Sequence, residues 1–65
     1  MDYAQVQKTA QKLAHEGDTI QLDILLDKLA QEPDEMAQAL SVNLSSLRHT
    51  AFMNLQAKSA TQPQQ

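Results

Sequence analysis

Residues 34–57, with the sequence DEMAQALSVNLSSLRHTAFMNLQA, decide the fold. Apolar residues recur in this stretch at intervals of three or four, which is the spacing of one face of an α-helix. Pro33 precedes it and suits the first turn of a helix, because proline lacks a backbone N–H that would be unpaired there in any case. We therefore predict one long helix over residues 33–57. Its buried stripe is expected at Met36, Leu40, Leu44, Leu47, Ala51 and Leu55.

Two shorter helices are predicted before this stretch. Asp2 can cap the first, over about residues 2–15, by accepting a hydrogen bond from a free backbone N–H. Gly17 stands where helices often end in a left-handed residue. Asp18 opens the second helix, over about residues 18–31. The chain has one Gly and two Pro, so little else interrupts these helices.

The size of the chain limits its architecture. Sixty-five residues form one domain at most, and a single core of that size supplies only about 3–5 kcal/mol of net stability. The absence of Cys removes disulfides and thiolate metal sites as extra support. We predict an all-α fold, a small three-helix domain built as a helical hairpin or bundle over residues 1–58. Residues 59–65 are expected to form a disordered tail, because they have nothing to bury.

More apolar surface is present than three packed helices would cover. Ile and Leu point nearly all round the helix predicted at 18–31. Beside the stripe of the 33–57 helix lies a second strip at Ala39, Val42, Ser46, Thr50, Met53 and Ala57. We therefore predict a homodimer, with the alternative that the three helices pack on each other and these residues are isolated on the surface. The residues predicted to form a protein interface are Leu22, Leu26, Val42, Phe52 and Met53.

The sequence offers little for catalysis or metal binding. His15 lies beside Glu16 and near Asp18, but a histidine at the end of a helix usually complements the helix dipole. Asp23 and Asp27 are one helical turn apart without a third ligand at helical spacing. We predict a protein that is not an enzyme, with no catalytic residue, no metal, no cofactor and no small-molecule substrate.

Charge and the N-terminus bear on partners and location. The formal net charge is −3, and acidic residues dominate the middle of the chain. This balance disfavours non-specific capture of nucleic acid, which depends on a basic face. Residues 1–3 carry no basic segment and no apolar run follows, so we expect neither a signal peptide nor a membrane span. The predicted location is the cytoplasm.

One segment, residues 34–50, resembles a helix-turn-helix, the motif of many small DNA-binding regulators. The resemblance implies a turn at Ser41 and a recognition helix that begins near Asn43. It also implies packing between the two helices through Met36, Ala37, Leu40, Val42 and Leu47. Contacts to DNA would come from Asn43, Ser45, Ser46, Arg48 and His49.

Two functions are therefore considered from the sequence. The first is a small regulatory or adaptor protein that dimerises through the helices predicted at 18–31 and 33–57 and acts by docking a helical face onto another protein. The alternative is a dimeric helix-turn-helix transcription regulator. They differ over residues 40–43, which form a turn only in the second.

Overall fold

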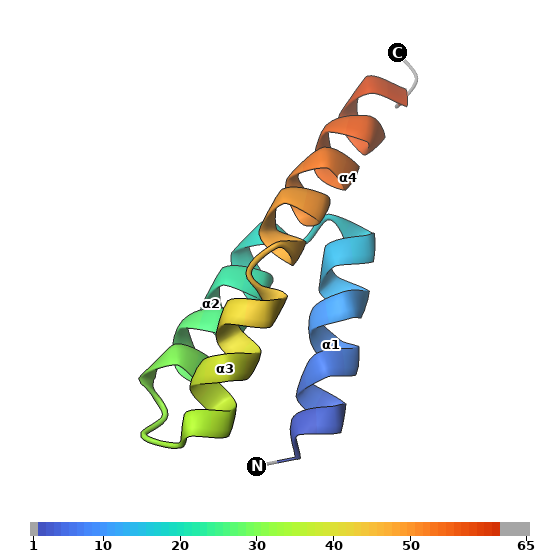
Figure 1. Ribbon diagram of the computed structural model, residues 1–65. Helices are drawn as coiled ribbons and strands as arrows, with labels where there is room; N and C mark the ends of the chain where they lie inside the picture. Colours follow the sequence, from blue (N-terminus) through green and yellow to red (C-terminus); the bar gives the residue numbers. More distant parts are fainter. Residues whose placement is uncertain (1, 62–65) are drawn as a thin grey trace.

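A computed structural model describes residues 2–61, and over that range every regular element is a helix. The predicted all-α class is confirmed. In Figure 1, α1 and α2 run in opposite directions, α3 returns beside α2, and α4 continues in nearly the direction of α3. The molecule is 48 Å long and 16 × 15 Å across. The helices are α1 (Tyr3–Glu16), α2 (Thr19–Gln31), α3 (Glu35–Leu44) and α4 (Leu47–Thr61).

Aspartate side chains begin the first three helices. Asp2 accepts a hydrogen bond from the backbone N–H of Gln5 at 3.2 Å. Asp18 does the same for Gln21 at 3.1 Å, and Asp34 accepts from the N–H of Met36 at 3.0 Å. Each bond satisfies a donor that has no partner within its helix. Helices α1 and α2 therefore begin and end within one residue of their predicted bounds.

The prediction of one helix over residues 33–57 is wrong, because a turn at Ser45 and Ser46 interrupts the helix. The Ser45 hydroxyl donates to the carbonyl oxygen of Val42 at 2.6 Å, and the Ser45 N–H donates to the same oxygen at 3.2 Å. Serine side chains that bond back to the preceding turn compete with the helical hydrogen bonds and bend helices. The segment predicted as one helix is therefore two helices, α3 and α4, joined by a short turn. We call α3 and α4 together the third rod of the fold.

The predicted ends of this rod also shift. Asp34 is the N-cap of α3, so Pro33 lies before the helix and not in its first turn. Helix α4 continues to Thr61, so residues 59–61 are helical where a disordered tail was expected. The rest of that predicted tail, residues 62–65, lies outside the described residues.

The core is small and rich in alanine. Its three largest fully buried side chains are Leu22, Leu26 and Leu29, all from α2. The other buried apolar residues are Ala10, Ala14, Ala37, Leu44 and Ala51. Alanine keeps side-chain bulk out of the contact, so the helix backbones can approach closely. The core therefore forms where α1, α3 and α4 all meet the leucine side of α2.

The end of α1 anchors α4. Gly17 adopts a left-handed conformation with φ 74°, and a Cβ atom built there would lie 2.9 Å from the backbone nitrogen of Leu55. The Asn54 amide donates to the Ala14 carbonyl oxygen at 2.9 Å, and the Lys58 amine donates to that of Glu16 at 3.0 Å. The Lys58 bond gives a partner to a carbonyl of the last turn of α1, and the Ala14 carbonyl oxygen also accepts the Gly17 N–H at 3.1 Å. Helix α4 is thus held at its middle, and its last turns extend past α1 and α2 (Figure 1).

Candidate protein-interaction surface

Seven large apolar side chains remain exposed in the described part of the chain. The most exposed are Ile20 and Val42, each at 71%, while Phe52 and Met53 are each at 49%. Single exposed apolar residues are normal on a monomer. This short chain has seven of them, so it matters whether they gather on one part of the surface. The remaining members of the set are Ile24, Met36 and Leu55.

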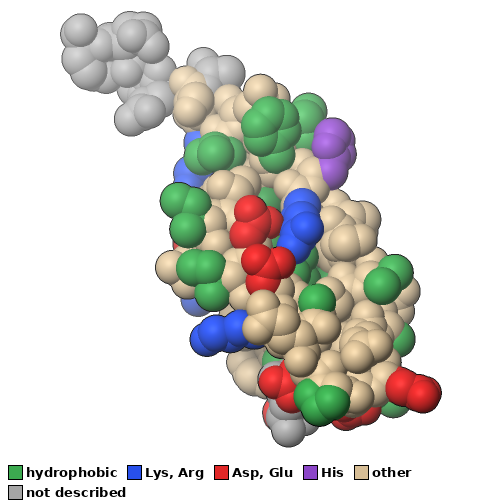
Figure 2. All heavy atoms as spheres, turned by 90° about the vertical axis from the view of Figure 1, so that its left-hand side faces the viewer, with side chains coloured by type: hydrophobic (Ala, Val, Ile, Leu, Met, Phe, Trp, Pro, Cys, Tyr) green, Lys and Arg blue, Asp and Glu red, His purple; other side chains and the backbone are tan. Residues whose placement is uncertain are grey.

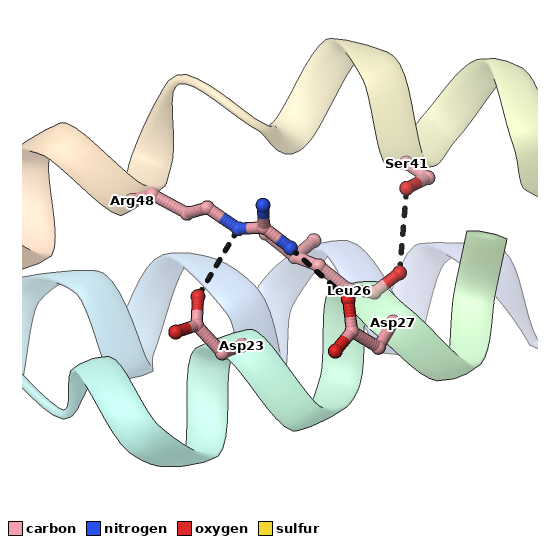
Figure 3. A network of polar contacts seen from close by, with 5 residues as sticks. All are labelled: Asp23, Leu26, Asp27, Ser41 and Arg48. Carbon is pink, nitrogen blue, oxygen red and sulfur yellow. Dashed lines mark hydrogen bonds and ion pairs between the residues drawn. The ribbon is translucent and has the colours of Figure 1, made fainter.

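An ion-pair cluster links α4 to α2. The Arg48 Nε atom lies 3.1 Å from a carboxylate oxygen of Asp23, and its Nη2 atom lies 3.4 Å from one of Asp27. Figure 3 shows the guanidinium group reaching across from α4 to these two carboxylates, which are one turn apart on α2. The three side chains are about half exposed or more. Solvent screening therefore limits their contribution to stability, but they fix which sides of the two helices share one face.

Apolar side chains flank this cluster on both helices. At about 100° per residue, Ile20 and Ile24 lie within about 60° of Asp27 around α2, on the side away from the core. By the same geometry, Phe52 and Leu55 lie within about 40° of Arg48 around α4. We call Ile20, Ile24, Phe52 and Leu55, together with the ion-pair cluster, the α2/α4 face. Figure 2 shows this side of the molecule, where hydrophobic side chains surround a group of acidic and basic ones.

The charges of the chain are divided between its two ends. All eight acidic residues and three of the five Lys and Arg lie in the first 35 residues. The remaining 30 residues carry Arg48 and Lys58 and no acid. With its N-cap, α2 carries three aspartates and one lysine, whereas α4 carries only basic groups. On the α2/α4 face itself, two carboxylates of α2 meet one cation of α4, Arg48, because Lys58 is turned to the Glu16 carbonyl oxygen of α1.

The structure separates the residues predicted to form a protein interface. Leu22 and Leu26 were expected to face a partner, and this is wrong, because they are buried at 0% and 1% exposure within the core. Val42, Phe52 and Met53 are exposed, so they stay available for the predicted association. Of these three, Phe52 lies on the α2/α4 face. Sequence reasoning did not select Ile20, Ile24 or Leu55, although helix phase measured from Leu22 places both isoleucines opposite the core.

The second strip on the third rod is exposed along its length. Its six members are all classed as exposed in the structure, so the chain itself does not cover them. The buried stripe is confirmed only in its centre, since Leu44 and Ala51 are buried while Met36 and Leu55 are not. The stripe loses cover at both ends because Met36 lies at the start of α3 and Leu55 lies level with the loop at Gly17.

The residues of the helix-turn-helix resemblance lie differently from that motif. Ser41 lies inside α3, where its hydroxyl donates to the Leu26 carbonyl oxygen at 3.3 Å, so the implied turn at this position is wrong. Helices α3 and α4 run in nearly the same direction in Figure 1, whereas the two helices of the motif cross at about 90–120°. Arg48 pairs with α2. The other proposed DNA contacts, Asn43, Ser45, Ser46 and His49, are exposed.

One further polar contact joins α1 to the start of α3. The Tyr3 hydroxyl donates to a carboxylate oxygen of Asp34. This hydrogen bond raises the pKa of Tyr3, with smaller contributions from burial and from the charges of Asp34 and Glu32. The same bond lowers the pKa of Asp34, helped by the bond from the backbone N–H of Met36. The contact ties the N-terminus of the chain to the turn between α2 and α3.

Other kinds of site are not found within residues 2–61. No pocket opens in this part of the chain, and no group of three or more His, Asp or Glu side chains gathers there as metal ligands would. None of the helices described combines the length and the apolar character that crossing a membrane requires. Comparisons with protein-family models, with curated proteins and with solved structures give no match.

Proposed function

We propose that this chain is a small regulatory or adaptor protein of the cytoplasm, which acts without catalysis by docking a helical face on a polypeptide partner. Its effect is steric or allosteric, because binding covers a surface of the partner or stabilises one of its conformations. The α2/α4 face is the proposed docking surface.

The observation that carries this proposal is the position of four large exposed apolar side chains around one ion-pair cluster. Interface cores are enriched in aromatic residues, Met and Arg, and a few desolvated side chains there supply most of the affinity. The eight buried residues of the core include no member of this face, so burying it against a partner leaves the fold intact.

A photo-cross-linking experiment tests the proposal. The chain is produced in its source cells with a photoreactive phenylalanine analogue at Ile24 or Phe52, and the control carries the analogue at Lys12, an exposed position on α1. We expect irradiation to give a covalent adduct of defined mass from Ile24 and Phe52, and little adduct from Lys12. Equal adducts from all three positions, or none from any, would contradict the proposal.

DNA binding is the second candidate, and one observation favours it. The last 30 residues carry no acidic group, so α4 would approach phosphates without repulsion from its own side chains. A gel-shift titration against mixed genomic duplexes tests this candidate. Specific binding that weakens several-fold in Arg48→Ala and His49→Ala would support it, and no retained duplex would remove it.

A further inference from the structure

We infer that the α2/α4 face binds a second copy of this chain, in a two-fold arrangement that lays α4 of each copy on α2 of the other. The inference rests on the proposed function, because it names the occupant of the same surface. It is carried by the charge and shape of the face.

The charges of the α2/α4 face complement those of a second copy. The exposed side of α2 carries Asp23 and Asp27 with Lys28 beside them, and the one cation of α4 on this face is Arg48, because Lys58 bonds to the Glu16 carbonyl oxygen. A two-fold axis through the centre of the face places the Asp23 and Asp27 carboxylates of each copy opposite Arg48 of the other. A partner helix of a single charge sign would suit α2 or α4 but would be repelled by the other one. A second copy suits both at once.

The apolar side chains of the two helices match in spacing. Ile20 and Ile24 are four residues apart on α2, and Phe52 and Leu55 are three apart on α4. Each pair therefore occupies about one turn of helix. In the two-fold arrangement the isoleucine pair of each copy packs on the Phe52–Leu55 pair of the other. Two identical contacts would bury all eight side chains.

Arg48 has N–H donors left for further hydrogen bonds. Within the chain, its Nε atom contacts Asp23 and its Nη2 atom contacts Asp27. A guanidinium group has five N–H donors in a planar fork, so other donors remain for a carboxylate across the axis. The side chains of Asp23 and Asp27 are 59% and 69% exposed, which leaves oxygens open to the other copy. The cluster would then hold four carboxylates and two guanidinium groups at the centre of the dimer.

Sedimentation equilibrium of the full chain gives the first test. Phe52 and Met53 form a matched pair, because they are adjacent on α4 and equally exposed at 49%, but Met53 lies about 140° from Arg48 around the helix. We expect the unmodified chain to be a dimer. Phe52→Asp should raise the dissociation constant at least tenfold, and Met53→Asp should change it little. A monomeric chain, or equal dissociation by both variants, overturns the inference.

Cross-linking gives a second test that does not depend on a destabilising substitution. The chain has no cysteine, so Ile24→Cys and Phe52→Cys each introduce one thiol. One variant is labelled with ¹⁵N, the two are mixed, and a short bis-maleimide is added. We expect the mixed cross-link between Ile24→Cys and Phe52→Cys to exceed each self-cross-link several-fold. Lys12→Cys, on the exposed side of α1, is the control. If the mixed cross-link is no more abundant than cross-links formed with this control, the two-fold arrangement is overturned.

The two proposals fail in different ways. If the purified chain is monomeric while photo-cross-linking at Phe52 in cells captures one other protein, the second copy is excluded and the proposed function stands. If the chain is monomeric and Phe52 captures no protein in cells, both are excluded. Normal helical circular dichroism of each variant shows that the loss of binding is not a loss of folding.

Discussion

Gly17 is the described position where the backbone conformation most restricts which residue type can be accommodated. Its φ of 74° is costly for a residue with a Cβ atom, and that atom would also meet the backbone of Leu55. We expect Gly17→Ala to lower the free energy of unfolding by about 1–3 kcal/mol, measured by urea titration with circular dichroism. Gly17→Asn is the control, because Asn tolerates the left-handed conformation but still carries the Cβ. Full stability of the Asn variant would show that the close approach to α4 is unimportant.

The hydrogen bond between Tyr3 and Asp34 is the largest cause of the lowered pKa of Asp34, and it gives a pH dependence that can be tested. The pKa of Asp34 is lowered, so its contribution to stability is present above the ordinary carboxyl pKa and is lost as the pH falls through the lowered one. Tyr3→Phe keeps the ring and removes the donor. We expect the pKa of Asp34 to rise toward its ordinary value in this variant, as read from a ¹³C NMR titration of its carboxyl carbon. An unchanged pKa would place the cause in the Met36 N–H bond alone.

The packing of α4 on α1 depends on small side chains. Ala51 is fully buried, and the Asn54 bond to Ala14 holds the two helices together at this level. Ala51→Leu inserts bulk where the backbones approach, so we expect a loss of about 1–3 kcal/mol in the free energy of unfolding. Ala39→Leu is the control on the exposed side of α3, where the change should stay within about 0.5 kcal/mol. Equal effects of the two substitutions in a thermal or urea melt would contradict this account.

Helix positions followed from the sequence where a local signal marked them. Asp2, Gly17 and Asp18 are caps whose chemistry is local, and the structure places the ends of α1 and α2 there. The break at Ser45 and Ser46 has no such signal. The apolar spacing continues in phase across it, and neither Gly nor Pro is present. At the break the Ser45 hydroxyl bonds back to the Val42 carbonyl oxygen. A serine within an uninterrupted helix would look the same in the sequence.

The candidate interface was predictable only in part for a related reason. Helix α2 is apolar nearly all round, so composition alone does not say which side meets the core. The packing of α3 and α4 buries Leu22 and Leu26 and leaves Ile20 and Ile24 outside. On α4, Phe52 and Met53 are separated from the core by their phase relative to Ala51, and sequence reasoning identified both as exposed. The pairing of Arg48 with Asp23 and Asp27 joins residues 21 to 25 positions apart, which local patterns do not reveal.

The core of the whole molecule is small, so we expect the binding of another chain to change the free energy of unfolding. Four of its eight buried apolar residues are alanines, which remove little apolar area from water. A second copy bound on the α2/α4 face would add eight larger side chains to the buried set. Folding and association would then be linked, and the stability of the chain would depend on its concentration.

This linkage predicts a concentration-dependent melt. For a dimer that unfolds to two free chains, each tenfold increase in concentration favours the folded state by about 1.4 kcal/mol per mole of dimer. We expect the midpoint of urea unfolding to rise accordingly in the unmodified chain and in Met53→Asp. In Phe52→Asp the midpoint should become independent of concentration below its raised dissociation constant, because the folded monomer is then the main native species. A midpoint that stays constant for the unmodified chain would mean that the four exposed side chains of this face contribute nothing to its folding, and that the alanine-rich core alone holds the helices together.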